Sequence, residues 1–183
     1  MLENCKKANT KLSFLHRYSS ILDFDTRRLL CSSLVSSGLN YCVSAWYPGL
    51  GEGLKGRLDI IQRKMVRFVN AWRPRDHVGE REINSVGWLF FPKRVSFFKL
   101  CHLFKVRLGQ APNYVAVDFC LTSNIHSHNT RGSRLNYHVD SAKFPPTTFH
   151  YTTVREWNSL PEYLKEISSL PLFKRKLKRH LSL

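Results

Sequence analysis

The stretch LKGRLDIIQRKMVRFVNAW, residues 54–72, carries the most regular apolar pattern in the sequence and decides the fold class. Its large apolar side chains recur at alternating steps of four and three, which is typical of one face of an α-helix. Basic residues lie between them, so the opposite face is predicted to be cationic. Such a face either contacts a polyanion or is only solvated, and the sequence leaves both interpretations open. The apolar positions are Leu54, Leu58, Ile61, Met65, Phe68 and Trp72, and the basic positions are Arg57, Arg63, Lys64 and Arg67.

The composition favours an intracellular protein that contacts nucleic acid. The 183 residues include 29 Lys+Arg against 13 Asp+Glu, a formal net charge of +16, which favours phosphate backbones over acidic small molecules as partners. Hydrophobic residues make up 43% of the chain, which is enough for a core. The five cysteines are scattered without a Cys-x-x-Cys pair, and there is neither a signal-peptide pattern nor an apolar run of roughly 18 residues. We therefore expect reduced thiols, a nuclear or cytoplasmic location and no membrane partner.

Further helices are predicted on both sides of the central stretch, so the fold class is mainly α. Asp23 or Asp25 is a suitable N-cap for the helix at residues 27–46, and Gly38 is expected to kink that helix. A loop with three glycines and a proline follows, which suits a reversal of chain direction before the central helix. The other predicted helices span residues 6–22, 93–108, 111–119, 153–160 and 170–181.

Two groups of cations lie outside the central helix. Arg73 and Arg75 flank Pro74, which is expected to end that helix, and they extend the basic surface. The predicted helix at residues 170–181 places apolar side chains on one face and five cations on the other. A membrane-surface helix has the same pattern, but burial of the apolar face on the domain needs no added partner and is preferred. Its apolar residues are Leu170, Phe173, Leu177 and Leu181, and its cations are Lys174, Arg175, Lys176, Lys178 and Arg179.

The composition changes after residue 120, and this change predicts three parts. Residues 1–120 form a helical domain, residues 121–153 form a polar connector, and residues 154–183 form a basic helical segment. Residues 135–139 and 149–151 alternate apolar and polar side chains, which predicts a weak β-hairpin within the connector. The four tryptophans (Trp46, Trp72, Trp88 and Trp157) are predicted to be core anchors rather than platforms for stacked bases.

The sequence gives little support for an enzyme or a metal site. Cys120, His126 and His128 follow a spacing that fits none of the common zinc sites, so they are interpreted as loop residues. Cys42 and Cys101 are expected to be small core residues rather than nucleophiles. There is no Gly-x-Ser-x-Gly elbow and no phosphate-binding glycine loop. We therefore predict no catalytic residue, no metal and no cofactor for this chain.

Taken together, the order of several short phrases resembles the carboxy-terminal part of reverse transcriptases from non-LTR (LINE-type) retrotransposons, of the jockey and chicken-repeat groups. Each phrase alone is weak, but their shared order and spacing cover nearly the whole chain. The phrases are LNYCVSAW at residues 39–46, the block at 58–67 with IQR at 61–63, GWL at 87–89 leading to Arg94, LGQAPNY at 108–114, NTR at 129–131, WNSLP at 157–161 and FKRKL at 173–177.

This resemblance implies that residues up to about Phe119 correspond to the helical thumb, which in such polymerases lies against the template-primer duplex. The chain departs from the family because its aspartates (Asp23, Asp25, Asp59, Asp76, Asp118 and Asp140) are never adjacent. Two-metal nucleotidyl transfer needs carboxylates that hold both ions about 4 Å apart. Met1 in front of a thumb is therefore expected to mark a truncated copy or a fragmentary gene model, without its own catalysis.

The resulting hypothesis is a non-catalytic fragment that binds the backbone of RNA or DNA without sequence specificity. The expected contacts are the cations of the central helix, of the Pro74 turn and of the tail helix. The alternative is a helical protein-interaction module that docks on the missing polymerase palm or on a host protein, with its basic face only solvated.

Overall fold

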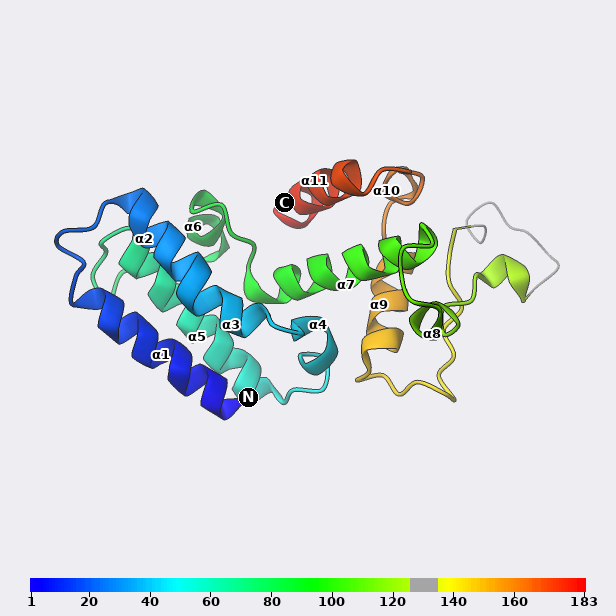
Figure 1. The fold of residues 1–183 in the computed structure, drawn as a ribbon, viewed down its shortest axis with the longest axis horizontal. Helices are drawn as coiled ribbons and strands as arrows, with labels where there is room; N and C mark the ends of the chain where they lie inside the picture. Colours follow the sequence, from blue (N-terminus) through cyan, green and yellow to red (C-terminus); the bar gives the residue numbers. More distant parts are fainter. Residues whose placement is uncertain (126–134) are drawn as a thin grey trace. The chain divides into compact units, whose positions relative to one another are not determined.

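The computed structural model describes residues 1–125 and 135–183, and its fold is mainly α-helical (Figure 1). The described residues contain no strand, only an isolated antiparallel bridge between Leu121 and Tyr137. They divide into two compact units, which are considered separately. Unit 1 comprises residues 1–43 and 50–92, and unit 2 comprises residues 44–49 and 93–183. These units do not coincide with the divisions expected after residues 120 and 153, which stay predictions.

Unit 1 is built around the predicted central helix, α5 (Glu52–Val69). Its apolar face is confirmed, because Leu58, Ile61, Met65 and Phe68 are each at most 1% exposed. The helices that precede α5 along the chain pack against it or against one another, and α6 contacts it after the following loop. These elements are α1 (Leu2–His16), α2 (Phe24–Leu30), the π-helical turn η1 (Cys31–Ser36), α3 (Ser37–Asn40) and α6 (Glu80–Ser85).

The single helix predicted at residues 27–46 is interrupted. Asp23 caps α2 as expected, since its carboxylate accepts a hydrogen bond from the Thr26 N–H at 2.8 Å. The chain then leaves helical geometry at Tyr41, whose ψ is 119°, and not at Gly38. Cys42 follows with a φ of 48° before the short helix α4 (Val43–Trp46). Cys42 is exposed, so its predicted place in the core is wrong.

The end of α5 also differs from the prediction. The helix closes with two backbone bonds, from Ala71 N–H to the Phe68 carbonyl at 3.3 Å and from Trp72 N–H to the Arg67 carbonyl at 2.9 Å. This motif needs a left-handed residue at the position of Ala71, whose φ is 55°, and an alanine there is strained by about 1 kcal/mol. Trp72 therefore lies outside the helix and is 37% exposed, and its prediction as a core anchor is wrong.

Unit 2 has its core between α7 (Phe91–Arg107), which begins in unit 1, and the helices that follow. The rings of Phe104 and Phe173 stack at 4.1 Å, and Trp157 lies 5.9 Å from Phe173 with no exposed surface. Trp157 is thus a core anchor as predicted. Cys101 is buried in the same cluster, also as predicted. The remaining elements are α8 (Asn113–Ala116), the 3-10 turn η2 (Thr122–Asn124), α9 (Phe149–Asn158), α10 (Glu162–Lys165) and α11 (Leu170–Leu181).

The predicted strand at residues 149–151 is wrong because α9 begins there. The Thr148 hydroxyl accepts a hydrogen bond from the Tyr151 N–H at 3.3 Å, so an N-cap overrides the alternating pattern. Residues 135–139 form no strand, because their backbone makes only a single antiparallel bridge, in which Thr122 N–H donates to the Asn136 carbonyl at 2.9 Å and His138 N–H donates to the Cys120 carbonyl at 2.8 Å. The Asn158 side chain binds the other edge of this segment. Its amide donates to the Tyr137 carbonyl at 2.8 Å and accepts from the Tyr137 N–H at 3.0 Å. The described residues therefore contain no β-hairpin.

The WNSLP phrase at residues 157–161 has a structural role in unit 2. The Trp157 indole donates to the Leu135 carbonyl at 2.9 Å, next to the bonds that Asn158 makes. Lys165 is buried and donates both to the Asn158 carbonyl and to the Asn136 side chain. This phrase fastens residues 135–137, which lie within the predicted connector, onto α9. Within the described residues, no helix is long and apolar enough to cross a bilayer.

Candidate nucleic-acid interface

The tail helix α11 has the most complete separation of apolar and basic faces. Phe173 and Leu177 have no exposed surface, because they pack into the core of unit 2. The five cations predicted on the other face are all exposed. Because two fully buried side chains fix the rotation of the helix, the cationic face is held toward solvent. The predicted amphipathic tail is thereby confirmed as a structural feature.

Four of the five cations of α11 form no ion pair with the described residues. The helix contains no acidic residue. Within residues 1–125 and 135–183, the side chains of Lys174, Arg175, Lys176 and Arg179 form no ion pair and donate no hydrogen bond. Lys178 and Arg179 lie in the last turn, where the free carbonyls of the helix favour cations. The outer face of α11 is therefore a surface of strong positive potential.

The cations of α5 are placed differently. Arg63 donates from Nη1 to the Val78 carbonyl at 2.8 Å, and Arg67 donates from Nε to the Asp76 carbonyl at 2.9 Å. Both side chains are half-buried, and together they fasten the loop at residues 70–79 to the helix. Both bond to backbone carbonyls and form no ion pair with the described residues, although the Asp59 carboxylate lies near enough to Arg63 to interact with its charge. Arg63 and Arg67 therefore stabilise unit 1 whatever else they contact.

The remaining predicted cations of unit 1 are exposed. Arg57 and Lys64 of α5 are exposed, and Lys64 donates to the Asn9 side chain of α1 at 3.0 Å. Arg73 and Arg75 are exposed in the loop after α5. The carboxylate of Asp76 accepts the backbone N–H of Arg73 at 2.6 Å, which holds the turn. The predicted site residues thus form two groups, one on each unit.

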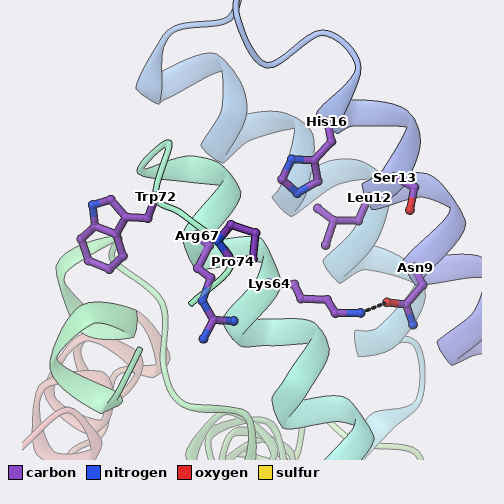
Figure 2. A pocket seen from close by; sticks show the side chains of 8 residues that line it. All are labelled: Asn9, Leu12, Ser13, His16, Lys64, Arg67, Trp72 and Pro74. Atoms are coloured by element: carbon purple, nitrogen blue, oxygen red, sulfur yellow. Dashed lines mark hydrogen bonds between the residues drawn. The ribbon is translucent and has the colours of Figure 1, made fainter. Parts of the chain in front are cut away.

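A pocket of about 420 Å³ lies in unit 1 between α1, α5 and the loop after α5 (Figure 2). It brings together Lys64 and Arg67 from the predicted set. It also includes side chains of α1 that sequence reasoning missed, because α1 carries no motif that distinguishes them. The pocket is lined by Asn9, Leu12, Ser13, His16, Lys64, Arg67, Trp72 and Pro74.

Nucleophilic and metal chemistry have few candidates in the described part of the chain. Burial raises the pKa of Cys101 to about 11 and that of Cys31 to about 12, so both thiols stay protonated at neutral pH. No group of three or more His, Cys, Asp or Glu side chains suited to a metal occurs among residues 1–125 and 135–183. His126 and His128, like the NTR phrase at residues 129–131, lie outside the described residues.

The two basic groups supply positive charge and hydrogen-bond donors. Exposed lysine and arginine side chains on rigid helices can contact phosphate oxygens, and arginine can do so through two parallel bonds. Comparisons with protein-family models, with curated proteins and with solved structures find no significant match to this chain. The functional argument therefore depends on the geometry of the two basic groups and on the resemblance of the sequence phrases.

Proposed function

We propose that this chain binds the sugar-phosphate backbone of RNA or DNA without sequence specificity, as a non-catalytic part similar to the thumb and post-thumb region of a non-LTR retrotransposon reverse transcriptase. The observation that carries the proposal is α11. Its buried Phe173 and Leu177 hold five exposed cations on one face, without acidic residues on the same helix. A solvated surface needs no such concentration of one charge, whereas a polyanion is attracted by it.

The chemistry of α11 favours backbone contact over base readout. Lysine and arginine that reach phosphate oxygens position a nucleic acid but carry no information about its sequence. Each contact releases condensed counterions, so the affinity depends on salt. The exposed cations of unit 1, which include Lys64, Arg73 and Arg75, form a second group of the same type. Two separate groups on one chain would raise the affinity for a long polyanion beyond that of either group alone.

In this proposal polymerisation belongs to another segment. The thumb resemblance covers residues up to about Phe119, and the chain has no pair of adjacent aspartates. The carboxylates that hold two metal ions would come from a palm outside this sequence. The role of this chain is then to hold the template or product while the palm acts. Such a role requires exposed basic side chains rather than a cluster of carboxylates.

A salt titration tests the proposed function. Binding of a labelled duplex DNA and of a labelled single strand is measured by fluorescence anisotropy over a series of salt concentrations. The logarithm of the affinity is expected to fall linearly with the logarithm of salt, by roughly 0.9 for each phosphate contact on the duplex and roughly 0.7 on the single strand. An affinity that does not respond to salt, or the absence of binding at low salt, would contradict the proposal.

A second candidate function is a protein-interaction module, and it follows from a different observation. Several large apolar side chains of α1 and α2 and of the loop between them are exposed in unit 1. Ile21 is 78% exposed, Leu29 is 67% exposed, and Phe14 is 54% exposed with its ring 5.3 Å from Tyr18. Exposed apolar side chains that lie in contact, as Phe14 and Tyr18 do, are a feature of interaction surfaces. In this alternative the partner is a polymerase palm or a host protein.

A pull-down with a purified palm fragment, next to a nucleic-acid control, separates the two candidates. The interaction module predicts capture of the palm that survives nuclease and high salt, and that is lost when Ile21 and Leu29 are replaced by Ser. Capture that disappears with nuclease would support nucleic-acid binding alone. Equal capture by the native chain and by the Ile21→Ser, Leu29→Ser variant would exclude Ile21 and Leu29 as contacts with the palm fragment.

A further inference from the structure

The pocket in unit 1 combines features that phosphate binding alone does not require. Two cations from α5 lie on one part of its wall, and polar side chains of α1 lie opposite them (Figure 2). Its volume of about 420 Å³ is in the range of sites for small organic ligands rather than for a single ion. Trp72 and Pro74 add apolar surface from the loop after α5.

The cations of the pocket keep hydrogen-bond donors for a ligand. Lys64 has three N–H donors and uses one on the Asn9 side chain at 3.0 Å. Arg67 uses Nε on the Asp76 carbonyl at 2.9 Å, and its two terminal nitrogens have no partner among the described residues. The bond through Nε holds the guanidinium in one orientation. A group that is oriented before binding loses less entropy when a phosphate arrives.

The exposed tryptophan is placed at the pocket by a strained turn. Ala71 has a φ of 55° at the position where α7, which ends with the same pair of backbone bonds, has Gly109 with a φ of 67°. Glycine is the residue that adopts this conformation without strain. Strain of this kind is found at functional sites, because the surrounding structure maintains it. Here the strained turn carries Trp72 out of the helix to the rim of the pocket.

We propose that this pocket binds one unpaired nucleotide of a nucleic-acid strand, with the phosphate at Lys64 and Arg67 and the base against Trp72. The inference rests on the proposed function and deepens it, because it names the form of nucleic acid that this part of the chain prefers. Base stacking on an aromatic side chain tolerates every base, which agrees with binding that lacks sequence specificity. The Ser13 hydroxyl can bond to a base edge or a sugar hydroxyl, and Asn9, whose amide donates to the Cys5 carbonyl and accepts from Lys64, keeps one further N–H for the same purpose.

The histidine of the pocket does not supply a third positive charge at neutral pH. Burial lowers the pKa of His16 below its ordinary value of 6.5, and its ring lies edge-on to Phe68 at 4.9 Å. The positive charge near the proposed phosphate therefore comes from Lys64 and Arg67. Two cations suit one phosphodiester, whereas the larger exposed group on α11 suits a longer stretch of backbone.

Substitution of Trp72 tests the proposal in the full chain. Binding is measured with a labelled oligothymidylate of about eight nucleotides and with a labelled duplex, at one fixed low salt concentration. Trp72→Ala is expected to weaken binding of the oligothymidylate about tenfold and to leave the duplex nearly unchanged, since stacking needs an unpaired base. Trp72→Phe, which keeps an aromatic ring, should restore most of the affinity for the oligothymidylate. The unfolding curve of each variant verifies that unit 1 is intact.

A charge placed in the pocket gives a second and independent test. Ser13→Glu adds a carboxylate to the exposed wall of the pocket, and Lys7→Gln changes the net charge by the same amount at an exposed position of α1 that does not line it. The proposal predicts that only Ser13→Glu lowers the affinity for the oligothymidylate selectively over the duplex. Equal effects of the two variants, or of Trp72→Ala on both nucleic acids, would overturn the pocket assignment. The proposed function would stand in that case, but it would fall if the native chain bound neither nucleic acid.

Discussion

Two basic helices of similar sequence pattern, α5 and α11, use their cations in different ways. On α5, the half-buried Arg63 and Arg67 donate to carbonyls of the following loop. On α11, the cations are exposed, and Lys174, Arg175, Lys176 and Arg179 have no side-chain partner in the described part of the chain. The count of arginine and lysine on a helix therefore does not say how many are available to a polyanion. That number depends on which backbone groups lie next to the helix.

The difference also separates stability from binding. Substitution of Arg63 or Arg67 removes a charge and releases a loop at once, so a loss of binding there has two causes. Substitution of Lys174, Arg175, Lys176 or Arg179 on the outer face of α11 removes charge without removing an ion pair of that residue among residues 1–125 and 135–183. Substitutions on the two helices, and in the core against which α11 packs, therefore separate an effect on stability from an effect on binding.

The largest effect is expected from the core side chain that holds α11 in place. Phe173 is fully buried and stacks on Phe104 at 4.1 Å, so Phe173→Ala should destabilise unit 2 by about 3–5 kcal/mol. Hydrogen exchange at the amides of α9 and α11 measures this loss in unit 2 alone. Lys174→Ala, at the next and exposed position, is the control and should change stability by less than about 0.5 kcal/mol. Similar protection in both variants would show that α11 is not held by its apolar face.

A smaller effect is expected at two neighbouring cations of α5. Arg63→Gln removes the bond to the Val78 carbonyl and should cost unit 1 about 1–2 kcal/mol, because a buried carbonyl loses a charged donor. Lys64→Gln removes the same charge from the same helix, but its bond to Asn9 is exposed, so the cost should be below about 0.5 kcal/mol. Hydrogen exchange of α5 and of the loop at residues 70–79 provides the measurement. If the two variants were equally stable, Arg63 would not fasten the loop.

Lowering the pH should destabilise unit 2, into whose core α11 packs, without substitution of any α11 cation. His150 is buried, with Nε2 at 2.6 Å from the Asp118 carbonyl and its ring stacked on Phe144 at 3.9 Å. Burial lowers the pKa of His150 in the folded state, and Lys143 lowers it further, although the contacts with Asp118 and Asp140 oppose this shift. The unfolded state therefore takes up a proton first when the pH falls below 6.5.

The free energy of unfolding of unit 2 should accordingly be highest above the ordinary histidine pKa of 6.5 and should decrease as the pH falls through the lowered pKa. Urea unfolding at several pH values, followed at α9, measures this decrease. His150→Phe should remove most of the decrease, because phenylalanine keeps the stacking but does not titrate. A decrease of equal size in the variant would assign the pH dependence to other groups.

Much of the helical fold was predictable because it follows from local patterns. The apolar steps of α5 and α11 correspond to buried faces in the structure, and Asp23 caps α2. The failures have tertiary causes. The pattern at residues 135–139 has the period of a strand, but its backbone forms only a single bridge with residues 120–122, and the side chain of Asn158 binds its other edge. The interruption at Tyr41 depends on backbone geometry that no single residue type signals.

The candidate site was predictable only in part. The sequence identifies the cations, and the strict segregation on α11 made their exposure predictable. It does not reveal that Arg63 and Arg67 contact carbonyls of the loop, since carbonyls are present at every residue and leave no sequence signal. It also misplaced Trp72, because the apolar period continues from Phe68 to Trp72, one residue beyond Ala71, where the left-handed backbone ends the helix. The pocket beside Trp72 therefore could not be anticipated from the sequence.

The salt dependence of duplex binding tests the central claim about α11 most directly. One variant replaces its five exposed cations by Gln, and a charge-matched control replaces five exposed cations elsewhere, namely Lys6, Lys7, Arg17, Arg81 and Arg155. If α11 contacts the phosphate backbone, the plot of log affinity against log salt concentration should be less steep for the first variant, by about 2 or more in slope, because each lost contact removes roughly 0.9. The control should change the slope much less. Equal slopes for the two variants, or a slope of the α11 variant that matches the native chain, would contradict the account.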